Sequence, residues 1–129
     1  MIAHFQRMIA HWTRACFGEK IARNRDERNQ RFLEESLELV QSLGASKQEC
    51  HDLVDYVFGR DIGETPQEIG GVLVCLASLC DVADLDMEAC GWIELERVDS
   101  DEMMEKIRRK HSLKPKFGKL SLVETEVLT

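Results

Sequence analysis

RFLEESLELVQSLG, residues 31–44, has the residue spacing of an amphipathic helix. The carboxylates of Glu34, Glu35 and Glu38 gather on one side of this helix, where Arg31 also lies. Like charges three or four residues apart repel by about 0.2–0.5 kcal/mol per pair. A hard cation such as Mg²⁺, which prefers oxygen ligands, would remove that repulsion. The alternative is a solvated polar surface, which Arg31 favours. The opposite, apolar side carries Phe32, Leu33, Leu37, Leu39, Val40 and Leu43.

The composition predicts one helical domain. The chain has 129 residues, 43% of them hydrophobic, with 6% aromatic residues and only two prolines. We expect an all-α domain over residues 1–112 and an irregular tail over residues 113–129, first basic and then acidic. The formal net charge of −7 argues against a nucleic-acid partner, because such proteins neutralise phosphates with a broad basic surface.

The cysteines and the apolar runs indicate a cytoplasmic protein. The cysteine number is odd, and no C-x-x-C pair occurs. We therefore expect reduced, mostly buried thiols. Charged residues and histidines interrupt the N-terminal segment, which excludes a signal-peptide core, and no apolar run is long enough to span a membrane. The cysteines are Cys16, Cys50, Cys75, Cys80 and Cys90.

Local signals divide the chain into four or five helices. One helix is expected over residues 2–17, ended by Gly18, and the acidic helix is capped by Asn24 or Asp26 and ended by Gly44. Three later starts carry capping patterns: Ser46-Lys47-Gln48-Glu49 before a helix to Phe58, Thr65-Pro66-Gln67-Glu68 with Thr65 as the cap, and Asp86 before residue 87. Asp99-Ser100-Asp101 is expected to break or restart the last helix.

Residues 69–80 contain no charged side chain. A helix that is apolar on nearly all sides is normally buried. Four or five helices from this chain cannot surround it completely. We therefore expect a partner subunit to supply the missing wall, in a homodimer or in a homotetramer built as a dimer of dimers.

Two further regions have alternative interpretations. Trp12 either stacks on a nucleobase or packs in the core. The last helix and the tail contain the one basic region of this acidic protein, which is either a solvated end or a binding surface for a phosphate chain. Its side chains are Lys106, Arg108, Arg109, Lys110, His111, Lys114, Lys116 and Lys119.

The two acidic segments resemble those of the MazG-like all-α nucleoside triphosphate pyrophosphohydrolases. That family has E-x-x-E on one helix and E-x-x-D at the start of a later helix. Glu35-Ser36-Leu37-Glu38 matches the first half, preceded by Glu34. Glu68-Ile69-Gly70-Gly71 is similar to the second half and is followed by an apolar helix and Asp84-Leu85-Asp86. The resemblance covers about residues 28–110.

The resemblance implies a helical bundle and a defined reaction. Mg²⁺, or Mn²⁺ in its place, would be held by Glu35, Glu38 and Glu68. Water activated with the help of Glu35 or Glu34 would attack the α-phosphorus of a nucleoside triphosphate, giving a nucleoside monophosphate and pyrophosphate. The substrate-binding candidates are Trp12, with a neighbouring subunit, for the base, and Lys106, Arg109 and Lys110 for the leaving group.

Gly71 stands where the family has its aspartate, so one acid of the set is missing. This departure keeps other functions open. A phosphoribosyl-ATP pyrophosphohydrolase is an alternative within the same fold. A catalytically degenerate module that binds nucleotide or a protein is an alternative of another class, and a purely structural helical dimer is a third.

Overall fold

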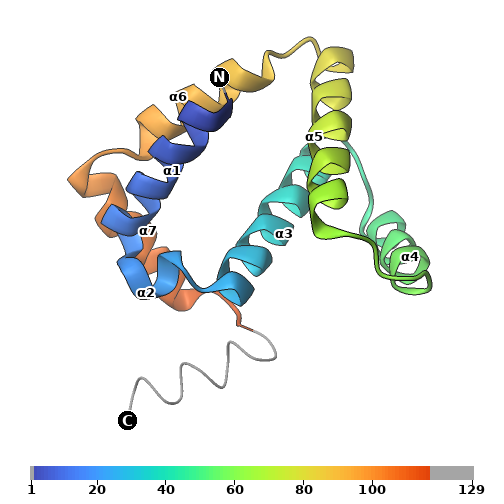
Figure 1. Ribbon diagram of the computed structural model, residues 1–129, viewed down its shortest axis with the longest axis horizontal. Coiled ribbons are helices and arrows are strands. Elements are labelled where there is room, and N and C mark those ends of the chain that lie inside the picture. Colours follow the sequence, from blue (N-terminus) through green and yellow to red (C-terminus); the bar gives the residue numbers. More distant parts are fainter. Residues whose placement is uncertain (1, 117–129) are drawn as a thin grey trace. The chain divides into compact units, whose positions relative to one another are not determined.

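The computed structural model describes residues 2–116, which contain seven α-helices and no strand (Figure 1). The all-α prediction is confirmed. The short α2 was not predicted, whereas the break of the last helix at Asp99-Ser100-Asp101 was expected and is confirmed. Residues 117–129, most of the predicted tail, lie outside the described part. The helices are α1 (Ile2–Phe17), α2 (Glu19–Ala22), α3 (Arg25–Ser42), α4 (Lys47–Phe58), α5 (Thr65–Val82), α6 (Met87–Val98) and α7 (Asp101–Leu113).

Most helix ends follow the local signals. Gly18 and Gly44 adopt φ values of 83° and 96°, the left-handed conformation that glycine adopts without strain. The Ser46 hydroxyl accepts a hydrogen bond from the Glu49 amide at 3.1 Å, and Asp86 accepts one from Ala89 at 2.8 Å. Ser100 caps α7 in the same way, accepting from Met103 at 3.2 Å. The predicted caps at Ser46 and Asp86 are confirmed, and the cap at Ser100 explains why the helix restarts there.

The structure shows which residues cap the starts of α3 and α5. Asn24, rather than Asp26, caps α3, because its side-chain oxygen accepts a hydrogen bond from the Glu27 amide at 3.1 Å. The predicted cap at Thr65 is wrong. Thr65 is the first residue of α5 and Glu64 is its N-cap, with the Glu64 carbonyl accepting from the Glu68 amide at 3.0 Å.

The chain forms two compact units, Met1–Leu33 with Trp92–Thr129, and Glu34–Gly91. In the first unit, α1 packs against α2 and α7 (Figure 1). Phe5 meets Trp92 edge-to-face at a centroid distance of 5.0 Å, and the Trp12 indole donates to the Val98 carbonyl at 3.1 Å. Every buried residue of the described chain belongs to this unit: Thr13, Cys16, Glu27, Leu95, Val98 and His111.

In the second unit, Glu34–Gly91, no residue is buried. The apolar helix predicted over residues 69–80 forms as part of α5, but the described residues 2–116 leave none of its side chains buried. Val74, for example, is 70% exposed. No helix within residues 2–116 combines the length and apolar character needed to cross a membrane.

All five cysteines are free, but only Cys16 is buried. The expectation of mostly buried thiols is therefore wrong for this chain, because Cys75 and Cys90 lie on exposed parts of α5 and α6. Burial raises the pKa of the Cys16 thiol, and the nearby positive charges of Arg108 and Arg28 act against that rise. Cys16 thus serves as a core residue of the first unit.

Candidate functional site

Three of the four predicted acids lie on one helix. Glu34, Glu35 and Glu38 belong to α3, within two turns of one another, as the residue spacing predicts. Glu34 is half-buried, whereas Glu35 and Glu38 are exposed. Glu68 lies in the first turn of α5. All four belong to the same compact unit, Glu34–Gly91.

The side chain of Glu68 lies against the loop that precedes its own helix. A Cβ added at Gly63 would collide with Oε1 of Glu68, so this carboxylate occupies the space beside the Gly63 backbone. Across residues 2–116, no three Asp, Glu, His or Cys side chains come close enough together to hold a metal ion. The structure therefore does not bring Glu35, Glu38 and Glu68 together as a Mg²⁺ site within the described chain.

Gly70 and Gly71 follow directly after Glu68 on α5. A Cβ added at either glycine would meet no atom of residues 2–116 within 4 Å, apart from its chain neighbours and the backbone of its own helix. Glycine inside a helix costs about 1 kcal/mol relative to alanine, and no close approach within the described chain accounts for these two. The missing aspartate at residue 71 is also not replaced by a neighbouring carboxylate, since no such group lies beside it.

The predicted substrate-binding residues belong to the other unit. Trp12 is half-buried; its indole N–H is satisfied by Val98, and its ring meets Phe17 edge-to-face at 6.0 Å. These contacts give it a packing role. Lys106, Arg109 and Lys110 are exposed on α7, where Arg109 pairs with Glu105 at 3.7 Å.

Formal charge divides unequally between the units. Residues 34–91 carry 13 Asp and Glu but only two Lys and Arg. The described remainder of the chain carries nine acidic and 14 basic residues. The acidic unit therefore has the electrostatic character of a cation-binding surface, even though its carboxylates are spread over several helices.

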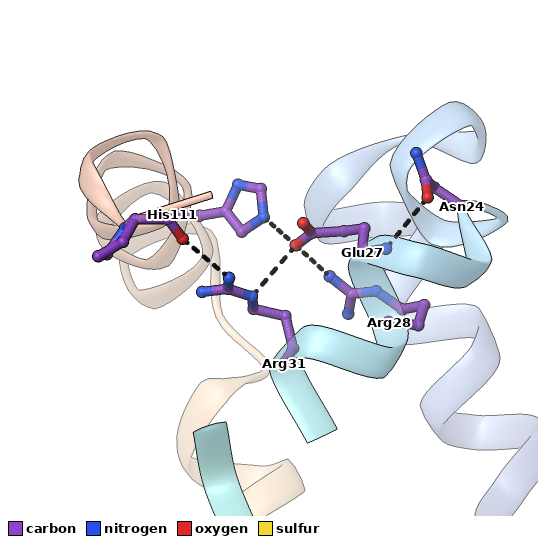
Figure 2. Close-up of polar contacts among 6 residues, drawn as sticks. Asn24, Glu27, Arg28, Arg31 and His111 are labelled. Atoms are coloured by element: carbon purple, nitrogen blue, oxygen red, sulfur yellow. Dashed lines mark hydrogen bonds and ion pairs between the residues drawn. The ribbon is translucent and has the colours of Figure 1, made fainter. Parts of the chain in front are cut away.

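A buried polar cluster in the first unit was not predicted from the sequence. The Glu27 cluster consists of Asn24, Glu27, Arg28, Arg31 and His111 (Figure 2). Oε1 of Glu27 is hydrogen-bonded to Nε2 of His111 and lies 3.1 Å from Arg28 Nη2 and 3.5 Å from Arg31 Nε. Glu27 is 3% exposed and His111 is 7% exposed. The cluster fastens the first turn of α3 to the last turn of α7.

Neighbouring groups reinforce the Glu27 cluster. The Arg28 guanidinium lies 5.0 Å from the centroid of the Phe17 ring, and that ring lies 5.0 Å from the His111 ring. Arg31 also donates to the Pro115 carbonyl at 3.3 Å, which holds the chain just beyond α7. The buried charge of Glu27 is therefore paired with cationic side chains through Oε1, as a buried charge requires.

The same contacts control the pKa of Glu27. Burial by itself would raise it, but the hydrogen bond with His111 and the charges of His111, Arg31 and Arg28 outweigh burial and lower it. The Glu27–His111 pair could not be predicted from the residue pattern. Glu27 is one of several charged residues in residues 19–31, and His111 is one of several basic residues in the last helix and the tail. Asn24 gave the only local signal, as the predicted cap.

The chain was compared with family models, with curated proteins and with solved structures. None of the three comparisons gave a match.

Proposed function

We propose that this protein hydrolyses a nucleoside triphosphate to a nucleoside monophosphate and pyrophosphate, with Mg²⁺ or Mn²⁺ as cofactor. The observation that carries the proposal is the pair of acidic motifs. Glu34, Glu35 and Glu38 lie on α3, Glu68 begins α5, and both belong to one acidic unit. The order of acidic helix, intervening helix and second acidic helix start is the order that the resemblance to the MazG-like enzymes requires.

The reaction needs a water oxygen to bond to the α-phosphorus while the bond from that phosphorus to the bridging oxygen breaks. Pyrophosphate leaves with the bridging oxygen, and the water proton passes to a base, for which Glu35 or Glu34 is proposed. Glu35, Glu38 and Glu68 do not meet as a metal site within the described chain, so no step is assigned to the ion. Lys106, Arg109 and Lys110 are proposed to bind phosphate on the basis of their charge.

The test is pyrophosphate release from a panel of nucleoside and deoxynucleoside triphosphates, with and without Mg²⁺. Glu38→Gln keeps the size of the side chain but removes its charge, and we expect it to lower the rate by about 100-fold or more. Glu96→Gln, an exposed glutamate of α6 in the other unit, is the matched control and should retain the rate. Release that is absent with every nucleotide, or equal in the two variants, would contradict the proposal.

A second candidate is a module that binds nucleotide without hydrolysing it. Gly71 in place of an acid, and the lack of three clustered metal ligands within residues 2–116, favour this function. Thermal unfolding with nucleotide and Mg²⁺ distinguishes the two. A ligand at 100 times its dissociation constant adds about 2.7 kcal/mol of stability. Stabilisation without pyrophosphate release would identify the binding module, whereas no response to either ligand would leave only a structural role.

A further inference from the structure

We propose that one end of the first unit binds a nucleic acid through its phosphate backbone. This basic end comprises residues 17–31, which include α2 and the first turns of α3, and residues 106–116, which include the last turns of α7 (Figure 1). The two segments together carry 11 Lys and Arg but only three Asp and Glu. Positive charge is therefore concentrated in one part of a chain whose formal net charge is −7.

Tertiary contacts join the two segments of the basic end. The Glu27 carboxylate is hydrogen-bonded to His111, 84 residues away in the chain, and the Phe17 ring lies 5.0 Å from the His111 ring. Arg31 donates to the Pro115 carbonyl at 3.3 Å. The basic run at the end of the chain, which the sequence predicts, is therefore joined by the cations of α2 and of the start of α3.

The carboxylates of the basic end do not neutralise its exposed cations. Glu27 is buried within its cluster, and Glu19 lies 3.1 Å from Arg14. Five exposed cations make no side-chain hydrogen bond or ion pair within residues 2–116: Lys20, Arg23, Arg25, Lys106 and Lys110. An anion from another molecule can contact these cations without displacing a partner that belongs to the described chain.

The basic end lacks the apolar residues that other kinds of partner need. Protein interfaces are centred on buried aromatic or aliphatic side chains, and charged residues are depleted there. A helix that binds a membrane surface inserts several apolar side chains among the lipids. Within residues 17–31 and 106–116, only Leu113 is a large apolar side chain that is exposed. A surface of lysine and arginine with so little apolar area favours phosphate groups.

The spread of the cations favours many phosphates over one. Lys106, Arg109 and Lys110 lie three and four residues apart on α7, so they are neighbours on one side of that helix. The other exposed cations lie on α2, on the connection to α3 and at the start of α3. A single phosphate group can touch only a few of these side chains, whereas a nucleic acid presents a phosphate about every 3.4 Å along each strand.

The acidic balance of the whole chain does not prevent such binding. It argues against a broad basic surface, but charges attract or repel mainly within a Debye length, about 8 Å at 0.15 M salt. We therefore expect a local contact that neutralises about four to six phosphates. Because phosphates are the same in every sequence, the contact should not depend on the base sequence.

Fluorescence anisotropy of a labelled DNA duplex of about 20 base pairs tests the proposal, with EDTA present to remove divalent ions. We expect a dissociation constant of about 1–100 µM at 0.15 M KCl, the range of sequence-independent binding. The logarithm of the association constant should fall with the logarithm of the KCl concentration, with a slope of about −4 to −5. A second duplex of unrelated sequence should bind with the same affinity.

Arg25→Glu tests the surface itself. Arg25 is the exposed first residue of α3, and reversing its charge should weaken DNA binding about five- to tenfold and lower the salt slope by about one to two. Glutamate is favoured in the first turn of a helix by the helix dipole, so the variant should fold at least as well as the wild type. Arg7→Glu, an exposed change on α1 outside the basic end, is the matched control and should bind within about twofold of the wild type.

Competition distinguishes a nucleic acid from other anionic partners. A peptide of about 20 glutamates, at equal total charge, should displace the labelled DNA several-fold less well than unlabelled duplex. The reason is linear charge density, because duplex DNA carries a charge about every 1.7 Å and an extended peptide about every 3.3–3.6 Å. Displacement as strong as that by DNA, from this peptide or from phosphatidylserine vesicles, would identify a protein or a membrane instead and overturn the proposal.

Three further results would overturn it. These are no change of anisotropy at about 0.05 M KCl, an affinity that does not respond to salt, and equal weakening by Arg25→Glu and Arg7→Glu. Pyrophosphate release is judged separately, since DNA binding is measured without Mg²⁺. A protein that binds DNA but releases no pyrophosphate contradicts only the proposed function, and an active protein that binds no DNA contradicts only this inference.

Discussion

The two compact units have the same secondary structure but differ in burial. The first unit, Met1–Leu33 with Trp92–Thr129, contains every buried residue of the described chain, and these include an ion pair and three apolar side chains. The second unit, Glu34–Gly91, forms regular helices, of which α4 and α6 have side-chain caps at Ser46 and Asp86, but it has no buried residue. Caps and spacing thus suffice to form a helix in either unit, but they do not supply the partner that its apolar side needs.

The comparison also separates two kinds of acidic residue. Glu27 is enclosed by a histidine and two arginines and contributes to the stability of the first unit. Glu35 and Glu38 are exposed on the continuation of the same helix, in a unit with few basic residues. One acid thus belongs to the packed part of the first unit, whereas the other two lie on the surface of the second unit, to which the proposed function assigns the metal.

The largest loss in the free energy of unfolding is expected for Glu27→Gln in the first unit. This change leaves Arg28, Arg31 and His111 without their buried counter-charge, and losing one partner of a buried pair costs about 3–5 kcal/mol. Urea unfolding followed by circular dichroism measures the loss. Glu38→Gln, an exposed change on the same helix, should stay within about 0.5 kcal/mol of the wild type. Equal effects of the two substitutions would show that the Glu27 cluster does not stabilise the first unit.

Truncating one leucine in each unit sharpens the comparison. Leu95 is 8% exposed, and Leu95→Ala should cost about 2–5 kcal/mol through lost burial and a new cavity. Leu53 is 62% exposed in the chain, so Leu53→Ala should cost less than about 0.5 kcal/mol in a single chain. The pair is compared by thermal unfolding at several protein concentrations. A concentration-dependent loss for Leu53→Ala alone would show that Leu53 becomes buried when chains associate.

Acid should weaken the first unit through Glu27. Its pKa is lowered on folding by His111, Arg31 and Arg28, in spite of burial. The stability from this group is therefore fully present above the unfolded glutamate pKa of about 4.3 and is lost as the pH falls through the lower folded value. Melting temperatures of the wild type and Glu27→Gln should converge on acidification. A gap that stays constant down to pH values below the folded pKa would contradict this assignment.

The smallest effect is expected for an exposed ion pair of α6. Arg97 Nη2 lies 2.6 Å from Glu94 Oε1, and the hydrogen bond from Arg97 lowers the pKa of Glu94 despite partial burial. Both side chains are more than half exposed, and such pairs contribute only about 0.2–1 kcal/mol. Glu94→Gln should therefore shift the unfolding midpoint in urea slightly, and less as salt is added. A loss of stability as large as that of Glu27→Gln would mean that the short distances of an ion pair matter more for its contribution to stability than its burial.

Much of the helical layout could be predicted from the residue pattern. The ends at Gly18 and Gly44 and the caps at Ser46 and Asp86 depend on residues within one turn, so local chemistry specifies them. The start of α5 was misplaced by one residue because Thr65 is the better capping residue by type, yet the helix begins at Thr65 and the Glu64 side chain makes no capping hydrogen bond. The acids of α3 were also placed correctly, since their spacing along one helix fixes their positions.

The amino-acid sequence by itself determined the helical class, most helix ends and the acidic character of residues 34–91, because these properties depend on near neighbours and on composition. Only the tertiary structure decided that Glu27 pairs with His111, 84 residues away, and that the Trp12 indole N–H donates to the Val98 carbonyl. Such contacts depend on how the helices pack. The periodic spacing of apolar residues indicates only that one side of a helix must be covered, and not which residues cover it. For α5 that partner is absent from the described chain, which is why its burial could be expected from the sequence but was not found in the fold.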